Sequence, residues 1–402
     1  KLVNQLYKNK FLSTISFLLV VMCPRLYEDS FVNTKDIPFM SMFFVCFYLI
    51  YSAFTKMKPL NFFYLGVSIG LLISLRIMGV LLFSSVLVFL LIDLLLLNNY
   101  KKNSILLATF FVTTLLAAYF SWPYLWENPF KNFISTFNNM SKFNWHQTNL
   151  FMGNFIMATE LKWYYIPVWF CITIPLFFLI PGILGIPLLG YSLFTKFKLY
   201  VNNTPERNNV YYVICFITPV IAVILFKSVL YDAWRHLYFI YAPFVLLIIY
   251  CLHALYLTKF KKVLILFSIS YLVFVGYTSI KIHPFQNVYF NELMDKNTPE
   301  YLKMNWEQDY WGVSYRQTLE YILEHDTSSK INILPENDPG IYNSYILQSD
   351  KRKRLHFTNI DSANYFITNF RWHPSDYAGA GKYLFSSVRV YNNSINASYK
   401  IR

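Results

Sequence analysis

The sequence predicts a polytopic α-helical membrane protein with a small α/β domain at its carboxyl end. Of its 402 residues, 56% are hydrophobic and only 14% are charged, whereas a soluble domain carries about 25% charged residues. The long apolar stretches end near residue 280, and residues 281–402 are polar. These observations exclude an ordinary soluble enzyme and a disordered chain, and they divide the protein into a membrane bundle, 1–280, and a domain, 281–402.

The apolar stretches predict about nine membrane spans, because a helix needs about 20 residues to cross a bilayer. The candidate spans are 5–23, 37–55, 60–75, 80–97, 105–121, 166–190, 210–229, 238–257 and 263–280. Four prolines interrupt the stretch 166–190, so we expect that span to be kinked or partly broken. In the polar domain, we expect a helix at 312–326 and strands at 331–334, 354–357, 363–368 and 387–391.

The charge distribution predicts how the chain is oriented. Residues 281–402 hold 14 Lys and Arg and 13 Asp and Glu, so most of the net charge of +14 lies in the membrane part, where it indicates topology rather than nucleic-acid binding. One alternate set of connections holds 13 of its basic residues and the other holds 8. Because lysine and arginine concentrate on the cytoplasmic side, the first set is cytoplasmic and the carboxyl-terminal domain lies outside.

This orientation places the reactive groups on one side of the membrane. Six of the eight acidic residues of the membrane part and every tryptophan lie on the outer side. The five cysteines lie in or beside apolar stretches and form no disulfide or metal-binding pattern, which favours a bacterial envelope over a disulfide-rich lumen. We therefore expect an inner-membrane protein with a functional surface on its periplasmic face.

Two charged residues at the outer ends of predicted spans are candidates for a site. Asp36 stands at the start of a span, where a carboxylate is either a helix cap or a group that binds a sugar hydroxyl or positions an acceptor. Arg76 stands at the end of another span, where a guanidinium either extends to the lipid headgroups or binds the phosphate of a lipid-linked donor. The local sequence leaves both alternatives open for each residue.

Asp232, Arg235 and His236 form a further candidate, since their i, i+3 and i+4 spacing would place them on one helical face. An ion pair explains Asp232 and Arg235. It does not explain why Asp, Trp, Arg, His and Tyr gather at the mouth of a span, where polar groups are costly unless they are used or paired.

Two aromatic and acidic segments complete the candidates. Glu160 precedes Trp163 and Tyr164, which are either an interfacial anchor or a platform for a sugar ring. Asp309 and Tyr310 lie where the polar domain begins, and they either dock that domain on the membrane or contact a sugar or an acceptor. The chain has no glycine-rich nucleotide-phosphate loop, so a transferase would need a donor that is already activated on a lipid.

Five segments together resemble the bacterial protein O-mannosyltransferase-like branch of the GT-C glycosyltransferases, which use polyprenyl-phosphate-linked sugars. They are NTKDIPF (33–39), WYYIPVW (163–169), YDAWRHLYFIY (231–241), HPFQNVYFN (283–291) and DYWG (309–312). The resemblance implies that Arg76, with Arg235 and His236, lies near the donor phosphate and that Asp36 is a second, supporting acidic position. The family's main catalytic base belongs to an earlier outer loop. Because the chain begins with Lys1 rather than methionine, we expect it to be a fragment whose missing part carries that base.

The sequence therefore predicts a glycosyltransferase that moves a sugar from a polyprenyl-phosphate carrier to an acceptor hydroxyl. It does not identify the sugar, or whether the acceptor is a protein, lipid A or another glycan, and it leaves a divalent metal open. The alternative is a transporter or a lipid-binding envelope assembly factor, for which Asp93 is the main acidic candidate inside a span. Transporters usually show charges at mid-membrane and internal repeats, and no repeat is visible here.

Overall fold

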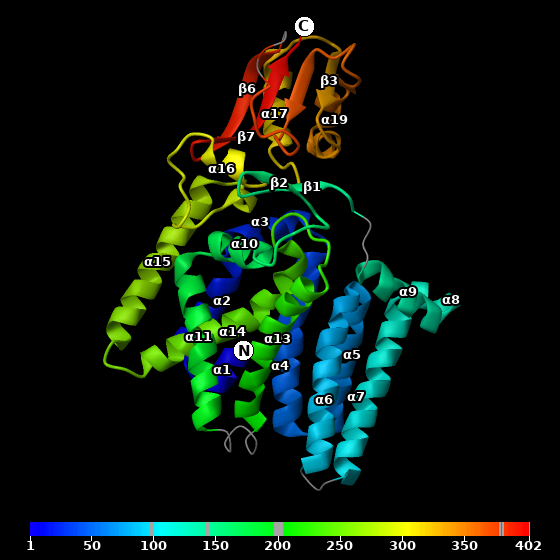
Figure 1. Cartoon of the computed structure of the whole chain (residues 1–402), viewed down its shortest axis with the longest axis vertical. Helices are drawn as coiled ribbons and strands as arrows, with labels where there is room; N and C mark the ends of the chain where they lie inside the picture. The colour runs from blue at the N-terminus through cyan, green and yellow to red at the C-terminus, as the bar shows by residue number, and fades with distance from the viewer. Residues whose placement is uncertain (97–99, 142–144, 197–203, 378, 380–381, 402) are drawn as a thin grey trace.

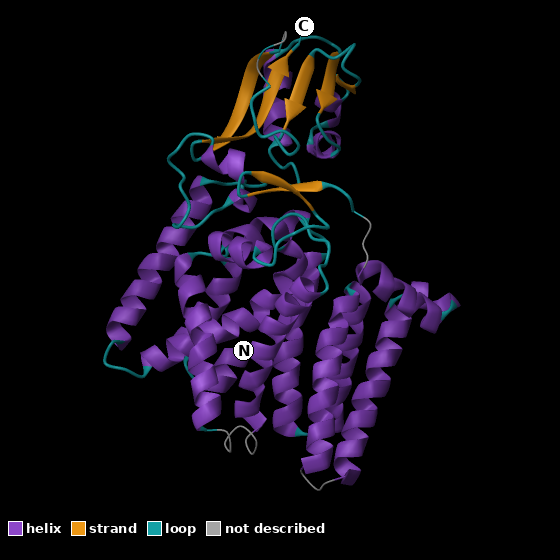
Figure 2. Ribbon diagram, in the orientation of Figure 1, coloured by secondary structure: helices purple, strands orange, loops and turns teal. Residues whose placement is uncertain are grey.

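The computed structural model describes residues 1–402 except 97–99, 142–144, 197–203, 378, 380–381 and 402. A bundle of helices forms the larger part of the molecule, and a small sheet domain covers one end of it (Figures 1 and 2). The helices of the bundle are α1 (Leu2–Tyr7), α2 (Lys10–Val21), α3 (Pro24–Val32), α4 (Asp36–Lys56), α5 (Pro59–Leu75), α6 (Val80–Leu96), α7 (Tyr100–Ser121), α8 (Tyr124–Glu127), α9 (Pro129–Ser141), α10 (Tyr165–Thr173), α11 (Leu176–Thr195), α13 (Thr204–Leu225), α14 (Tyr241–Tyr256) and α15 (Lys261–Lys281).

Six helices in the described part of the chain are long and apolar enough to cross a membrane, and a seventh span results if α2 and α3 are counted together. The predicted number of about nine is not confirmed. The segments α5 and Asn209–Leu225 are apolar but shorter, and α2 and α3 are bent by 56° relative to each other. The proline-rich stretch breaks as expected, because α10 ends before Pro175 and α11 begins after it.

The end of the bundle that carries the sheet domain also carries α3 and the short hairpin β1 (Thr148–Phe151) and β2 (Asn154–Met157) (Figure 1). The end of α6 and the start of α7 lie at the opposite end (Figure 1). Helix α4 begins at the domain end, α5 returns to it, and the 3₁₀ segment η2 (Arg235–Ile240) leads from it into the buried helix α14. Three chain segments therefore bring their ends together beneath the sheet domain.

Small residues allow α5 and α7 to approach closely. Gly66 and Gly70 are four residues apart on α5, and a Cβ atom added to Gly70 would lie 2.6 Å from both Ala117 Cβ and the Thr114 carbonyl oxygen. A contact of this length is too short for a side chain, so the pairing of these helices requires glycine. Such small-residue contacts are a common means of helix association in membranes.

We expect Gly70→Ala to destabilise the protein by about 1–3 kcal/mol, because the added methyl group meets the backbone of α7. Thermal unfolding in detergent measures the effect. The matched control is Gly190→Ala on α11, since an added Cβ there meets no atom within 4 Å and alanine improves helix propensity by up to about 1 kcal/mol. Equal unfolding temperatures for the two variants would contradict the close-packing account.

The carboxyl-terminal domain is a five-stranded mixed sheet in the order β4-β3-β5-β7-β6. Its strands are β3 (Ile331–Pro335), β4 (Leu355–Phe357), β5 (Tyr365–Thr368), β6 (Tyr383–Val390) and β7 (Asn393–Lys400), and its main helix is α17 (Tyr315–His325). The predicted helix and four strands all correspond to these elements. Strand β7 was not predicted, because its buried positions include Asn393, Asn396 and Ser398 as well as apolar residues.

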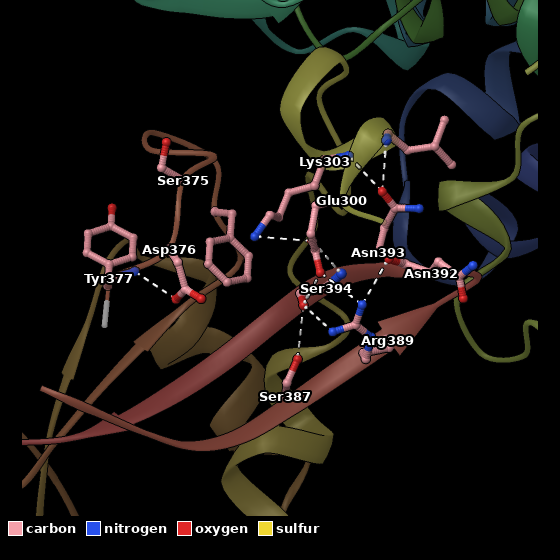
Figure 3. Close-up of polar contacts among 12 residues, drawn as sticks. Glu300, Lys303, Ser375, Asp376, Tyr377, Ser387, Arg389, Asn392, Asn393 and Ser394 are labelled. Atoms are coloured by element: carbon pink, nitrogen blue, oxygen red, sulfur yellow. Dashed lines mark hydrogen bonds and ion pairs between the residues drawn. The ribbon is translucent and has the colours of Figure 1, made fainter. Parts of the chain in front are cut away.

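Polar contacts hold the β6–β7 hairpin against the short helix α16 (Tyr301–Asn305) (Figure 3). Glu300 lies 2.9 Å from Arg389 and 3.2 Å from Lys303, and it accepts hydrogen bonds from the backbone and hydroxyl of Ser394. Asn393 Oδ1 accepts hydrogen bonds from the backbone N–H groups of Leu302 and Lys303 in α16. These contacts, which we call the Glu300 clasp, hold α16 to the β6–β7 hairpin and so stabilise the domain.

Candidate functional site

Asp36 is the first residue of α4, and its side chain is buried, with 4% of its surface exposed. The carboxylate forms an ion pair with Arg76, lies 3.8 Å from Arg235 Nη1, and accepts a hydrogen bond from the Asn33 side chain at 3.0 Å. Asn33 Oδ1 in turn accepts the backbone N–H of Asp36. The Asp36 carboxylate therefore binds two guanidinium groups. The side chain that caps the first turn of α4 is that of Asn33 and not that of Asp36.

Arg76 ends α5 in an extended conformation and directs its guanidinium to Asp36. Its side chain is 16% exposed, compared with 8% for Arg235. Arginine has five N–H donors, so a single contact with Asp36 leaves donors for a further acceptor. We call Asp36, Arg76 and Arg235 the charged cluster.

The loop before η2 is strained and differs from the predicted helix. Asp232 and Ala233 both adopt left-handed backbone conformations, with φ of 58° and 56°, and η2 begins at Arg235. The expectation that Asp232, Arg235 and His236 share one helical face is therefore wrong. The ion pair forms nevertheless, with Arg235 Nε 3.1 Å from Asp232 Oδ2, while the His236 ring contacts Tyr231, with ring centroids 4.6 Å apart.

Aromatic rings surround the Arg235 guanidinium. Its central carbon lies 4.7 Å from the ring centroid of Tyr231, 4.4 Å from that of Tyr310 and 5.1 Å from that of Trp311. Cation–π contacts of this kind orient a guanidinium and become stronger when water is excluded. Tyr310 and Trp311 follow residue 281 in the chain, so the carboxyl-terminal domain forms part of the surroundings of the charged cluster.

A small polar pocket lies between the bundle and the domain. Its lining includes Asp29 of α3, which accepts a hydrogen bond from Trp311 Nε1 at 2.8 Å and another from the Tyr238 hydroxyl. Arg25 also lines it, donates to the Tyr289 carbonyl oxygen, and buries an Nη2 group that has no hydrogen-bond partner among the residues that the structure describes. The lining residues are Arg25, Asp29, Asp232, Tyr238, Asn287, Glu307, Gln308, Asp309, Tyr310 and Trp311.

Three acidic side chains of this pocket, Asp232, Glu307 and Asp309, are largely buried in loops, where the local dielectric constant is low. Burial raises the pKa of the Asp232 and Glu307 carboxyls above their ordinary values. Burial also raises the pKa of Asp309 to about 6, although hydrogen bonds from Ser314 and Asn287 favour its ionised form. Pockets with perturbed acidic groups of this kind are characteristic of functional sites.

The raised pKa of Asp309 makes stability depend on pH. The unfolded chain releases this proton near pH 3.8 and the folded chain near pH 6, so the folded state binds more protons between these values. Stability therefore falls as pH rises through this range, with a slope of up to about 1.4 kcal/mol per pH unit. We expect Asp309→Asn to flatten the unfolding temperature between about pH 4 and pH 6, relative to the wild type and to a variant of the exposed Asp350. An unchanged slope would contradict this assignment.

Residues 1–122 match the family model described as dolichyl-phosphate-mannose-protein mannosyltransferase. This match confirms the predicted resemblance to mannosyltransferase-like GT-C enzymes. The matched segment spans α1 to α7 and contains Asp36 and Arg76, but it ends before Arg235. No curated protein and no solved structure matches the chain. The family match and the apolar helices together indicate a multi-pass membrane protein of the glycosyltransferase type.

Glu160, Trp163 and Tyr164 lie on the connection between β2 and α10. Trp163 is 66% exposed, and its ring contacts that of Tyr164, with centroids 5.6 Å apart. Among the described residues, the hydrogen bonds, ion pairs and cation–π contacts of Asp36, Arg76 and Arg235 involve none of these three residues. An exposed tryptophan beside a carboxylate fits a surface on which a sugar could stack.

Two further observations concern alternatives left open by the sequence. Within the described part of the chain, no three His, Cys, Asp or Glu side chains gather as they would to bind a metal ion. Asp93 is buried near the end of α6, where its backbone carbonyl accepts a hydrogen bond from Asn103 of α7. It thus lies near the carboxyl end of α6 and the start of α7, at the end of the bundle opposite the sheet domain, rather than in the middle of the span.

Sequence reasoning did not select Arg25, Asp29, Glu307 or Arg371 as site residues. Glu307 and Trp311 are close in sequence to Asp309 and Tyr310, and the density of acidic and aromatic residues in this segment was a usable signal. Arg371, whose Nη2 lies 3.1 Å from Glu307 Oε1, carried no such signal, because it lies in the loop after β5, 64 residues from Glu307 in the sequence.

Proposed function

We propose that this protein is a membrane glycosyltransferase that moves a sugar from a polyprenyl-phosphate carrier to an acceptor hydroxyl. One observation carries the proposal: the charged cluster is buried where span ends meet, beneath a domain that adds aromatic and acidic groups. A lipid-linked donor needs such a boundary, because its tail belongs in the bilayer and its phosphate and sugar do not. The family match of residues 1–122 supports the same class of reaction.

Arg76 and Arg235 bind the donor phosphate in this proposal, with His236 beside them. Arg76 is the more accessible of the two guanidiniums, and guanidinium groups match phosphate oxygens bidentately. Asp36 orients both arginines. The negative charge that develops on the phosphate as it leaves is then stabilised by donors that are already in place, which is the most effective form of electrostatic catalysis.

The reaction forms one bond and breaks another. The acceptor oxygen attacks the anomeric carbon, the bond from that carbon to the phosphate oxygen breaks, and polyprenyl phosphate leaves with the electron pair. A carboxylate takes the hydroxyl proton. By resemblance, the main base belongs to an outer loop that comes earlier in the fold than Asp36, and Asp36 supports it. The sugar and the acceptor contact Asp232, Asp309 and Tyr310 in the pocket, and Glu160, Trp163 and Tyr164 on the exposed platform.

The location follows from the distribution of charge in the sequence. We propose that the charged cluster and the carboxyl-terminal domain face the periplasm of a bacterial inner membrane, opposite the lysine-rich connections. The acceptor, whether protein, lipid A or glycan, then approaches from the periplasmic side. The family match is described in terms of a mannose donor, and mannose is therefore the first sugar to test.

The test uses full-length protein in detergent or nanodiscs with polyprenyl-phosphate mannose and related lipid-linked sugars. We expect release of polyprenyl phosphate that depends on both protein and acceptor. Binding of these lipids with no transfer to protein, lipid A or glycan acceptors would instead favour a lipid-binding assembly factor and would overturn the proposal.

A further inference from the structure

We propose that Arg371 and Glu307, both from the carboxyl-terminal part of the chain, are positioning residues that fix the strained Asp232–Arg235 loop and thereby orient Arg235. The inference rests on the proposed function for its catalytic consequence. Its structural consequence can be measured separately. The name domain strap is used below for Glu307, Tyr310 and Arg371.

Glu307 is the central member of the domain strap. Its side chain is 4% exposed; one oxygen lies 3.1 Å from Arg371 Nη2, and the other accepts the backbone N–H of Asp232 at 3.3 Å. A single carboxylate thus links the loop after β5 to the loop before η2. The Arg371 side chain is buried as well, at 7% exposed. Water therefore does not solvate either charge, and each charged group is stabilised by the other.

The Asp232 N–H matters because of the backbone that carries it. Two successive non-glycine residues with positive φ, Asp232 and Ala233, cost about 1–3 kcal/mol each and persist only when their surroundings hold them. The hydrogen bond to Glu307 and the ion pair to Arg235 hold this turn from its two sides. The conformation of this turn therefore fixes the backbone position from which the Arg235 side chain extends.

Arg371 also acts on Arg235 through an aromatic ring. Its guanidinium carbon lies 4.2 Å from the centroid of Tyr310, and that of Arg235 lies 4.4 Å from the same ring. The loop that carries Arg371 is fixed as well, since Asn369 donates to the Asp309 carbonyl oxygen at 2.9 Å. Arg371 therefore reaches Arg235 by two routes, through the backbone of Asp232 and through Tyr310, and we infer that it acts without touching substrate.

The central experiment compares Arg371→Ala with Arg371→Lys and with Arg389→Ala. Arg389 belongs to the Glu300 clasp (Figure 3) and reports loss of domain stability in general. We expect Arg371→Ala to lower kcat for sugar transfer by about 10- to 100-fold with little change in KM for the donor, because small displacements of a catalytic group have effects of this size. Arg371→Lys should recover part of kcat, since it restores the charge but not the planar stacking on Tyr310. Arg389→Ala should keep kcat.

Hydrogen exchange gives a readout that does not require activity. Arg371→Ala and Glu307→Gln should both accelerate amide exchange in residues 228–235, whereas Arg389→Ala should leave that segment unchanged. If the wild type transfers no sugar, the proposed function fails, but the exchange result still tests the strap. If Arg371→Ala leaves both kcat and exchange in 228–235 unchanged, or if Arg389→Ala impairs them equally, the positioning role is wrong.

Discussion

Replacing Arg76 by alanine is expected to lower kcat/KM for transfer from a polyprenyl-phosphate sugar by about 10²- to 10³-fold. The reason is that Arg76 is the accessible guanidinium of the charged cluster, and removing one preorganised donor that faces a developing negative charge costs about 3–4 kcal/mol of transition-state stabilisation. Arg76→Lys should recover only part of the loss, because an ammonium group cannot replace bidentate contacts with phosphate. Initial rates of polyprenyl-phosphate release measure the effect.

The matched control for Arg76 is Arg316→Ala on α17. Arg316 forms an ion pair with Glu320 at 2.9 Å, with side-chain exposures of 52% and 38%, so its loss removes an arginine–carboxylate pair far from any proposed chemistry. We expect that variant to keep full activity. If Arg76→Ala keeps full activity, as Arg316→Ala is expected to do, Arg76 does not bind the donor phosphate during catalysis.

Replacing Asp36 by alanine is expected to destabilise the protein by about 3–5 kcal/mol, because it leaves the buried Arg235 and the partly buried Arg76 without the carboxylate that they share. Asp36 is 4% exposed and contacts both Arg76 and Arg235. Asp36→Asn should also destabilise the protein, since the amide keeps the shape of the side chain but not its charge. Unfolding temperature in detergent gives the measurement, with the exposed Glu320→Ala as the control.

A double variant separates charge imbalance from packing at Asp36. If the loss arises from uncompensated positive charge, Asp36→Ala combined with Arg76→Ala should be less destabilised than the sum of the two single changes, since neighbouring residues couple in this way. Strict additivity would show that the two side chains do not act as a pair and would contradict the geometry of the charged cluster.

The sequence predicted the parts of the fold that depend on local patterns. Apolar stretches located the helices, and the prolines around Pro175 correctly indicated a break between α10 and α11. Short apolar segments predicted four strands. Strand β7 was missed because its buried positions include polar side chains: Asn396 accepts a hydrogen bond from Thr318 of α17, and the Ser398 hydroxyl is hydrogen-bonded to that of Ser386. The predicted number of about nine spans is not confirmed, because α5 and Asn209–Leu225 are apolar but short and because α2 is bent relative to α3.

The candidate site shows a similar division. Asp36, Arg76 and Arg235 were each recognisable as charges at span ends, and the structure joins them. Their convergence was not predictable from spacing, since Arg76 is 40 residues from Asp36. The left-handed turn at Asp232 replaced an expected helix because contacts from Glu307, 75 residues away, stabilise it. Only the folded chain reveals contacts of this kind.

A structure of the full-length protein with polyprenyl phosphate bound tests the central claim most directly. We predict that the phosphate lies within hydrogen-bond distance of the Arg76 guanidinium, with Arg235 behind it and the lipid tail directed along the bundle. A phosphate bound at any other place, with the ion pair of Asp36 and Arg76 untouched and closed to it, would contradict the account.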